Sequence, residues 1–157
     1  MKIPALRLIG LLLLLTVALV TVWGHVPNLF FNSVRVPVSV CASDACFDVE
    51  VVKDKVAMER GLQGRTGLVQ GHGMLFVFTT DDRHRFWMKD MKIPLDIIWI
   101  RQDGTIVSVG EDLPACTTQD CSVYAPSEPA RYVLEITTHN AAQYGFTQGR
   151  QLTIKGL

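Results

Sequence analysis

The sequence predicts a mainly β domain, either a single sandwich of jelly-roll-like type or a barrel, with two short helices and a preceding N-terminal apolar helix. Three observations support this fold class. About six or seven short segments alternate apolar and polar residues with the period of two of a half-buried strand. Turn signals that contain Gly, Pro or Asp separate these segments. The 157 residues provide room for one domain and a short appendage, and they contain no internal repeat.

Residues 1–31 are expected to be a signal anchor or a signal peptide. Residues 8–24 contain no charged side chain, and Lys2 and Arg7 precede them, which orients this end toward the cytoplasm. The formally uncharged stretch continues to Phe31 without an Ala-x-Ala cleavage site. This favours an anchor helix of roughly 20 residues over a cleaved signal. Under either alternative, the rest of the chain is expected outside the cytoplasm, in the periplasm or on an outer face. It is then anchored in the inner membrane by the helix or secreted.

Residues 32–46 indicate a linker that contains a leading strand, VRVPVSV, and a cysteine pair. Four residues separate Cys41 from Cys46, and four separate Cys116 from Cys121 in a later loop. Thiols outside the cytoplasm usually oxidise, and a chain that turns back brings such neighbours within reach. We therefore predict two local disulfides among the three pairings that four cysteines allow. The spacing is less typical of a four-thiolate zinc site or of C-x-x-C redox chemistry.

The β domain is expected to span residues 47–157. Its first strand is FDVEVV (47–52), in which apolar and acidic residues alternate. Asp54 is then expected to cap a short helix, and Gly61 to stop it, because Gly tolerates the backbone conformation that ends helices. After the turn QGHG, the segment GMLFVF (73–78) indicates a second and more apolar strand.

The second half of the domain begins with a predicted hairpin. LDIIWI and TIVSVG flank RQDG, and Asp103-Gly104 within it is a strong hairpin signal. Residues 111–129 form a long loop, which suggests a function or a staple, and the second cysteine pair would be that staple. RYVLEIT then predicts a strand, HNAAQYG a helical turn that ends near Gly145, and QLTIKG a final strand.

The balance of charge limits the classes of partner. The formal net charge is zero, from 15 basic and 15 acidic residues. Without Lys2 and Arg7, 13 basic residues remain in the outer domain beside 15 acidic ones. Domains that bind nucleic acid carry a basic stripe, so we expect no nucleic-acid partner. The outer domain likewise has no polybasic patch for a lipid surface, and its contact with a membrane is expected through the N-terminal helix alone.

The stretch HRFWMKDMKIPLDIIWI (84–100) contains the strongest candidates for a site. As a strand, it places Phe86 and Met88 on one face, where we expect core packing, and Trp87 and Lys89 on the other. The second face is a ledge on which the ring can stack against an apolar or sugar surface while the lysine contacts an anion. The same face is equally consistent with core from which the lysine reaches water.

Two carboxylates in apolar strands are further candidates. Asp96 lies on a strand face otherwise made of isoleucine, and a buried carboxylate needs a hydrogen-bond donor. We expect Arg60 to pair with Asp96 or with Asp90. A structural tie is favoured over a catalytic role for Asp96, and solvation at a strand end is the third alternative. Glu135 in VLEIT is either a base or the salt-bridge partner of Arg131.

Several segments in this order resemble a prokaryotic family, the domain of unknown function 192: ERGLQGR, GMLFVF, FWMKDMKIPLDIIWI, DGTIVSV, PACTTQDCSVYAPSEPARYVLEI and GFTQGRQL. The resemblance covers about residues 47–154. It implies a compact, mainly β domain of jelly-roll-like or sandwich type behind a signal peptide or anchor, and it brings no established reaction, ligand or catalytic residue. The sequence departs from the family pattern at GLQGR, at TTHNAA and in its last turn, and the first cysteine pair is an addition to it.

Three functions are consistent with these residues. The favoured one is an envelope-exposed binding or accessory module for a small molecule, a glycan or an envelope protein. An extracytoplasmic hydrolase that uses carboxylates or Lys89 is the alternative, although no nucleophile–base pair stands out, and metal or redox handling by the four cysteines is the third. A cavity with apolar walls that contains Trp87, without converging carboxylates, would support binding.

No sequence motif for a cofactor occurs, so no cofactor is expected. The ligand-binding hypothesis names Trp87, Lys89, Tyr124, Arg60, Asp90, Asp96 and Glu135.

Overall fold

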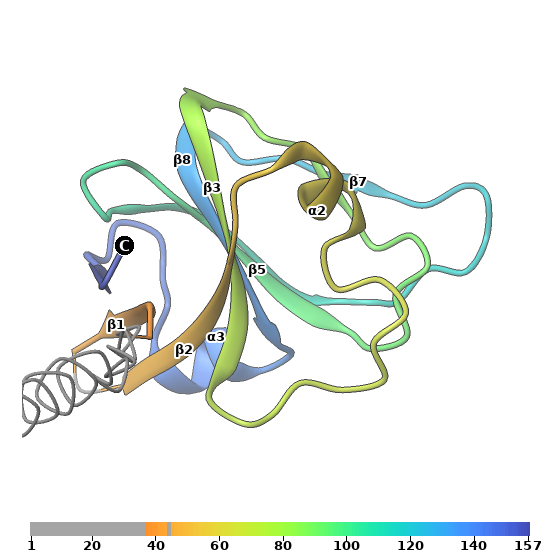
Figure 1. Ribbon diagram of the computed structural model, residues 1–157, viewed down its shortest axis with the longest axis horizontal. Coiled ribbons are helices and arrows are strands. Elements are labelled where there is room, and N and C mark those ends of the chain that lie inside the picture. Colours follow the sequence, from red (N-terminus) through yellow and green to blue (C-terminus); the bar gives the residue numbers. More distant parts are fainter. Residues whose placement is uncertain (1–36, 44) are drawn as a thin grey trace, which may run out of the picture. The chain divides into compact units, whose positions relative to one another are not determined.

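The computed structural model describes residues 37–43 and 45–157 (Figure 1). The predicted apolar helix and the signal anchor or signal peptide of residues 1–31 lie outside the described residues. Across the two described ranges, no helix combines the length and the hydrophobicity that crossing a membrane requires.

The described chain is mainly β, with one curled seven-stranded sheet, a two-stranded ribbon and two short helices. The order in the sheet is β6-β5-β8-β3-β2-β1-β9, in which β2 and β3 are parallel and all other neighbours are antiparallel. The sheet contains β1 (Ser39–Ala42), β2 (Ala45–Val52), β3 (His72–Asp82), β5 (Leu95–Ile100), β6 (Ile106–Leu113), β8 (Ala130–Thr137) and β9 (Thr153–Lys155). The ribbon pairs β4 (Phe86–Trp87) with β7 (Val123–Tyr124), and the helices are α2 (Lys55–Arg60) and α3 (Asn140–Tyr144).

The sheet curls into a half-barrel whose two ends approach each other. Thr105, just before β6, forms an isolated antiparallel bridge with Gln151, just before β9. The amide of Leu152 donates to the carbonyl of Gly104 at 2.9 Å, beside this bridge. The sequence predicted either a sandwich or a barrel. The described residues form one curled sheet, and in place of the second sheet of a sandwich they contain only the two-stranded ribbon.

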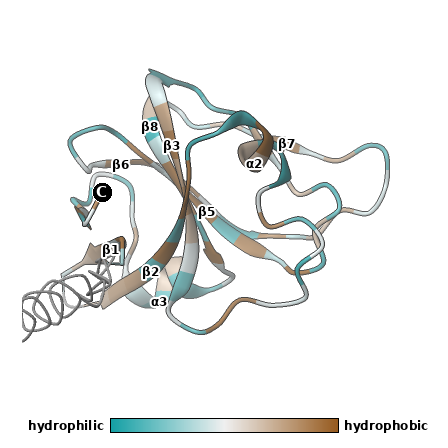
Figure 2. Cartoon of the chain, in the orientation of Figure 1, coloured by the Kyte–Doolittle hydropathy of each residue, from teal (hydrophilic) through white to brown (hydrophobic). Residues whose placement is uncertain are grey.

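The two faces of the sheet bury separate apolar clusters. Figure 1 shows α2 and β7 on one side of the central strands and β1 and α3 on the other. The first cluster includes Phe76, Met88 and Trp99 on the side of α2, and the second includes Phe47 and Ile98 on the side of α3. Figure 2 shows that the hydrophobic residues concentrate in the central strands. Strand β5 is buried along its whole length, because it lies between both clusters.

Helix α2 begins and ends as the sequence predicts. The side chain of Asp54 accepts a hydrogen bond from the amide of Ala57 at 2.9 Å, which satisfies one free donor of the first turn. Gly61 ends the helix with a φ of 48°, a conformation that other residues adopt only with strain. The chain therefore turns sharply after Arg60 and passes over the face of the sheet that carries Phe76.

Both predicted disulfides are confirmed. Cys41 and Cys46 are joined across the β1–β2 hairpin, with a Cα–Cα distance of 4.0 Å. Cys116 and Cys121 are joined within the long loop, with a Cα–Cα distance of 5.8 Å. The sheet includes residues 39–42 and 45–46, which the sequence analysis assigned to the linker.

Candidate functional site

A cavity of about 360 Å³ lies between α2, the segment around β4, and the face of β3 and β8 that carries the first apolar cluster. Its lining includes four phenyl or indole side chains. They are Phe76, Phe78, Phe86 and Trp87. Because strand residues two positions apart share a face, Phe76 and Phe78 project from β3 on the same side. The cavity therefore has apolar walls built by two separate segments of the chain.

Edge-to-face contacts hold the aromatic wall together. The ring of Phe86 lies 4.9 Å from that of Phe76 and 6.1 Å from that of Trp99, both nearly perpendicular to it. The ring of His84 stacks on Phe78 at 3.5 Å. Trp99, buried in β5, donates from Nε1 to the carbonyl of His84 at 2.8 Å. The segment that carries Phe86 and Trp87 is thus fastened to the sheet at several points.

Glu135 forms the inner end of the cavity. It lies in β8 opposite Met74 of β3 and Ile97 of β5, so its neighbours across the sheet are apolar. Its residue exposure is 5%, and Oε2 is buried without a hydrogen-bond partner. Burial raises the pKa of the Glu135 carboxyl to about 8, because the charged form loses its hydration. The carboxyl is therefore mostly protonated at neutral pH.

Gly61 lies directly over this inner end. A Cβ atom placed on Gly61 would lie 3.3 Å from Cζ of Phe76 and 3.8 Å from Oε2 of Glu135. The glycine that stops α2 therefore also leaves space beside the carboxyl, and any side chain at this position would enter the cavity.

The outer end of the cavity carries positive charge. Arg60 at the end of α2 and Arg85 just before β4 both line the cavity, and both are exposed. Within residues 37–43 and 45–157, neither guanidinium forms an ion pair or a hydrogen bond. A third cation at this end, Lys55, is paired with an acid, because its Nζ lies 3.9 Å from Oε1 of Glu59. The exposed end is thus cationic, and the buried end is a neutral acid.

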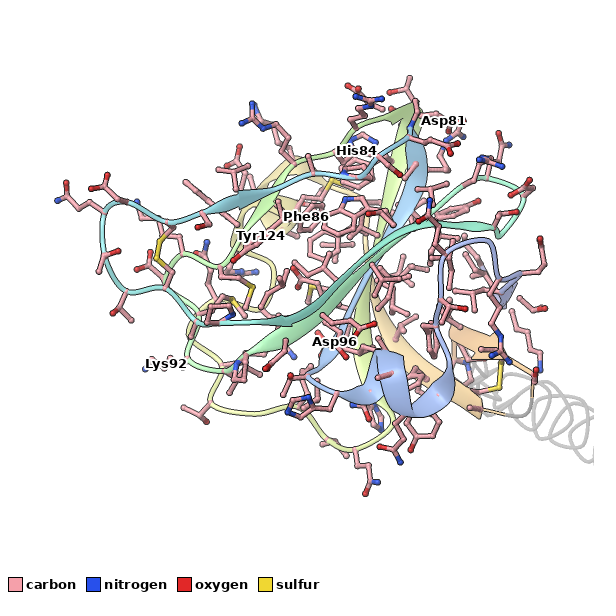
Figure 3. All side chains as sticks on the ribbon, turned by 180° about the vertical axis from the view of Figure 1, so that it is seen from behind. Asp81, His84, Phe86, Lys92, Asp96 and Tyr124 are labelled. Atoms are coloured by element: carbon pink, nitrogen blue, oxygen red, sulfur yellow. A yellow bond between two sulfur atoms is a disulfide. The ribbon has the colours of Figure 1, made fainter. Side chains whose placement is uncertain are left out.

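Two predicted site residues, Trp87 and Tyr124, lie in the ribbon of β4 and β7, and a third, Lys89, follows β4. Trp87 is 49% exposed and lines the cavity, and Nζ of Lys89 lies 5.3 Å from the centroid of its ring. Tyr124 lies opposite Phe86 in the ribbon, and Figure 3 shows these two side chains next to each other. Lys89 and Tyr124 themselves do not line the cavity. Phe86 and Met88 pack against the first apolar cluster, as expected.

The predicted ion pair of Arg60 is wrong. Asp96 is fully buried on the opposite face of the sheet, where its two oxygens accept from the amides of Asp112 and Ala141, each at 2.8 Å. Figure 3 shows Asp96 beside α3, away from Phe86. Asp96 is therefore the structural tie that the sequence analysis favoured, and it is not solvated.

Two further expectations about carboxylates need correction. Asp90 is exposed in a left-handed turn, with a φ of 58°, and in the described chain it forms no ion pair with Arg60. Glu135 does not pair with Arg131, because Nε of Arg131 lies 2.5 Å from Oδ1 of Asp81. The described residues contain no group of three or more His, Cys, Asp or Glu side chains that could hold a metal ion.

Phe76, His84 and Arg85 line the cavity but were not among the site residues predicted from the sequence. The alternation of GMLFVF does place Phe76 and Phe78 on one face, so a signal for the aromatic wall was present. No comparable signal exists for His84 and Arg85, because their position depends on the way the chain crosses from β3 to β4.

A model of the family DUF192, described as "Uncharacterized ACR", matches residues 38–154. A solved protein of unknown function from Novosphingobium aromaticivorans DSM 12444 is similar to this chain, with 28% identity and a TM-score of 0.67; the match covers 74% of this chain and 83% of that one. A protein from Sinorhizobium meliloti 1021, named as a proposed transcription regulator, has 30% identity and a TM-score of 0.68, with 76% and 93% covered.

No curated protein matches the chain. The family match extends over most of the described domain and includes both the aromatic wall and Glu135. The resemblance noted in the sequence is thereby confirmed, and the chain belongs to the DUF192 family.

Proposed function

We propose that the domain is a binding or accessory module that takes up a small organic molecule in the cavity between α2, β4 and β8. The observation that carries this proposal is Oε2 of Glu135, which is buried at the inner end without a partner. A buried polar atom without a hydrogen bond costs about 1–3 kcal/mol. A ligand that offers a hydrogen-bonding group to this carboxyl recovers that cost, and the aromatic walls contribute apolar contact.

The arrangement of carboxylates supports binding over hydrolysis. Hydrolases of the paired-carboxylate type need two acids that converge on one bond. Here Asp96 is hydrogen-bonded on the other face of the sheet, Asp90 is exposed in a turn, and Glu59 is exposed beside Lys55. Glu135 is thus the one buried carboxyl among the described lining residues.

The cysteines and the charge do not support the other functions. All four sulfurs are in disulfides, so no thiolate is free to ligate a metal. The name of the Sinorhizobium relative refers to transcription. With 13 basic and 15 acidic residues in the outer domain, this chain has no charge excess for nucleic acid, so we do not extend that role to it.

The proposed location of the module is outside the cytoplasm. Two disulfides are typical of proteins that mature in oxidising compartments. Residues 1–31 would deliver the domain and hold it at the membrane. Fractionation of cells that express the full chain is expected to recover it in the membrane fraction, accessible to protease from the outer side. Recovery in the cytosol would contradict the proposed location.

The proposed binding function is tested by a ligand screen on the full-length protein in lipid nanodiscs, with thermal unfolding followed by tryptophan fluorescence. Trp99 is buried and reports unfolding in every variant. We expect that compounds which raise the melting temperature of the wild type lose this effect in Trp87→Ala. Val123→Ala is the matched control, because Val123 is exposed opposite Trp87 in the ribbon but does not line the cavity. Compounds that stabilise Trp87→Ala as much as the wild type would contradict the proposal.

A further inference from the structure

We infer that the ligand of this cavity is an organic anion with a flat apolar body, an acidic group at the exposed end beside Arg60 and Arg85, and a neutral hydrogen-bond acceptor at the buried end beside Glu135. The inference rests on the proposed function and specifies the chemical class of the ligand at the same site. Three features of the cavity carry it: the two unpaired arginines, the buried acid whose Oε2 has no hydrogen-bond partner, and the aromatic walls between them.

Within the described residues, the arginines at the exposed end have no side-chain partner. The described residues contain seven arginines. Four of them have side-chain hydrogen-bond partners, namely Arg65, Arg101, Arg131 and Arg150. Arg60, Arg83 and Arg85 have none within the described ranges, and two of these three line the cavity. A guanidinium presents several donors in a plane and binds carboxylate, sulfonate or phosphate groups through paired hydrogen bonds.

The two arginines come from different parts of the chain. Arg60 is the last residue of α2, and Arg85 directly precedes β4. Both side chains are exposed, so an acidic group can reach them without displacing a buried residue. Glu59, the one exposed acid among the lining residues, lies against Lys55. The exposed end therefore keeps a net positive charge that attracts an anion and repels a cation.

The buried end requires a different group. Glu135 is 5% exposed, and its cross-strand neighbours Met74 and Ile97 are apolar, so its surroundings favour the uncharged carboxyl. Burial accordingly raises the pKa of Glu135. A protonated carboxyl donates one hydrogen bond, so the inner end of the ligand is an acceptor, such as a carbonyl, an ether oxygen or a ring nitrogen.

The walls define the body of the ligand. Phe76, Phe78, Phe86 and Trp87 line the space between the two ends, and edge-to-face contacts with Phe86 hold the rings of Phe76 and Phe78. Rigid aromatic walls favour a flat ring system, which contacts them by stacking or by its edge. The cavity volume of about 360 Å³ accommodates a bicyclic aromatic molecule.

A ligand with an amine is the competing chemistry. An amine at the buried end could take the proton of Glu135 and form an ion pair with the carboxylate, but it would have to pass Arg60 and Arg85. The sign of charge that the cavity prefers therefore discriminates between the two classes of ligand.

The experiment compares three probes with the same ring system: 2-naphthoate, 2-naphthalenemethanol and 2-naphthylmethylammonium. Their affinities for the full-length protein in zwitterionic nanodiscs are measured by titration calorimetry, with empty nanodiscs as the blank. We expect 2-naphthoate to bind about tenfold more tightly than the ammonium probe, as one charge-assisted contact implies. Replacing both arginines, Arg60→Gln with Arg85→Gln, is expected to remove this preference, so that the ratio of the affinities for 2-naphthoate and the ammonium probe falls from about ten to about one.

Arg83→Gln is the matched control, because Arg83 is an exposed arginine without a side-chain partner in the described chain and does not line the cavity. Equal or tighter binding of the ammonium probe overturns the inference. If all three probes bind equally and Trp87→Ala weakens all of them, the proposed function stands and the anion preference falls. Failure of all three to bind, or binding that is indifferent to Trp87→Ala, counts against the proposed function itself.

Discussion

Asp96 and Glu135 lie in adjacent strands, β5 and β8, and point to opposite faces of the sheet. Glu135 is the cross-strand partner of Ile97, so the preceding residue, Asp96, has the opposite orientation. Both residues are buried. Asp96 accepts two backbone hydrogen bonds, whereas Oε2 of Glu135 accepts none. The same residue class in the same part of the sheet therefore has a structural role on one face and lines a cavity on the other.

The first prediction concerns Asp96. Asp96→Ala removes the acceptor for the amides of Asp112 and Ala141 and leaves one partly buried and one buried donor without this partner. Because each such donor costs about 1–3 kcal/mol, we expect the free energy of unfolding to fall by about 2–5 kcal/mol. Urea denaturation measures this loss. Asp48→Ala is the control, because Asp48 is an exposed strand residue without a side-chain partner among the described residues. A loss no larger than that of the control would contradict the structural role.

The second prediction concerns the pH dependence of stability. Burial raises the pKa of Glu135 to about 8 in the folded protein, above its ordinary value of 4.5. Between these two values the folded state binds more protons at this position than the unfolded state, so the contribution of Glu135 to stability falls as the pH rises. Glu135→Gln does not titrate. We therefore expect the difference in unfolding free energy, variant minus wild type, to increase by about 1.4 kcal/mol per pH unit through this window.

The measurement is urea denaturation of both proteins at several pH values from about 5 to about 9, where the increase should end near the folded pKa. Hydrogen bonds from Arg65 and from Thr105 lower the pKa values of Glu50 and Asp103. These two groups change the stability of both proteins alike with pH, so the difference between the proteins isolates the contribution of Glu135. A difference that does not change with pH would show that Glu135 is ionised in the folded state.

Local signals in the sequence predicted much of the fold. The Asp103-Gly104 hairpin joins β5 to β6, and Asp54 and Gly61 bound α2, because caps and turns depend on a few adjacent residues. The parallel pairing of β2 with β3 was not predicted, and the choice between a sandwich and one curled, barrel-like sheet was left open. These depend on which distant strands pair, and a period of two carries no information about that.

The candidate site was predicted in part for the same reason. Trp87, Arg60 and Glu135 were selected from the sequence, and all three line the cavity. The predicted role of Arg60 was wrong, because alternation shows which residues of one strand share a face but not which face a separate helix covers. Asp96 faces α3, whereas Arg60 ends α2 on the other side of the sheet.

The third prediction concerns the disulfide of the long loop. Cys116→Ser with Cys121→Ser releases a loop of about six residues, and loop-closure entropy predicts a loss of about 2 kcal/mol in unfolding free energy. Cys116 also exchanges backbone hydrogen bonds with Met88 and Asp90, at 3.0 and 2.8 Å, so the segment after β4 should exchange amide protons faster in the variant. Urea denaturation and hydrogen exchange measure the two effects. Detection of free thiols in the native wild type would contradict the pairing.

The fourth prediction uses two glycines with positive φ. Gly61→Ala places a methyl group 3.3 Å from Phe76 and 3.8 Å from Oε2 of Glu135, so it fills the inner end of the cavity. Gly64→Ala also places an alanine at a positive φ, of 76°, but its methyl group meets no atom within 4 Å. Both variants should lose about 1 kcal/mol of stability or somewhat more, because alanine is strained at positive φ.

Only Gly61→Ala should also weaken binding of 2-naphthoate, by about tenfold or more, because its methyl group occupies space that the ligand needs. Titration calorimetry at a temperature where both variants are folded separates the effect on binding from the effect on stability. If Gly64→Ala weakened binding as much as Gly61→Ala, the loss would come from the strained backbone after α2, and the inner end of the cavity would have no part in recognising the ligand.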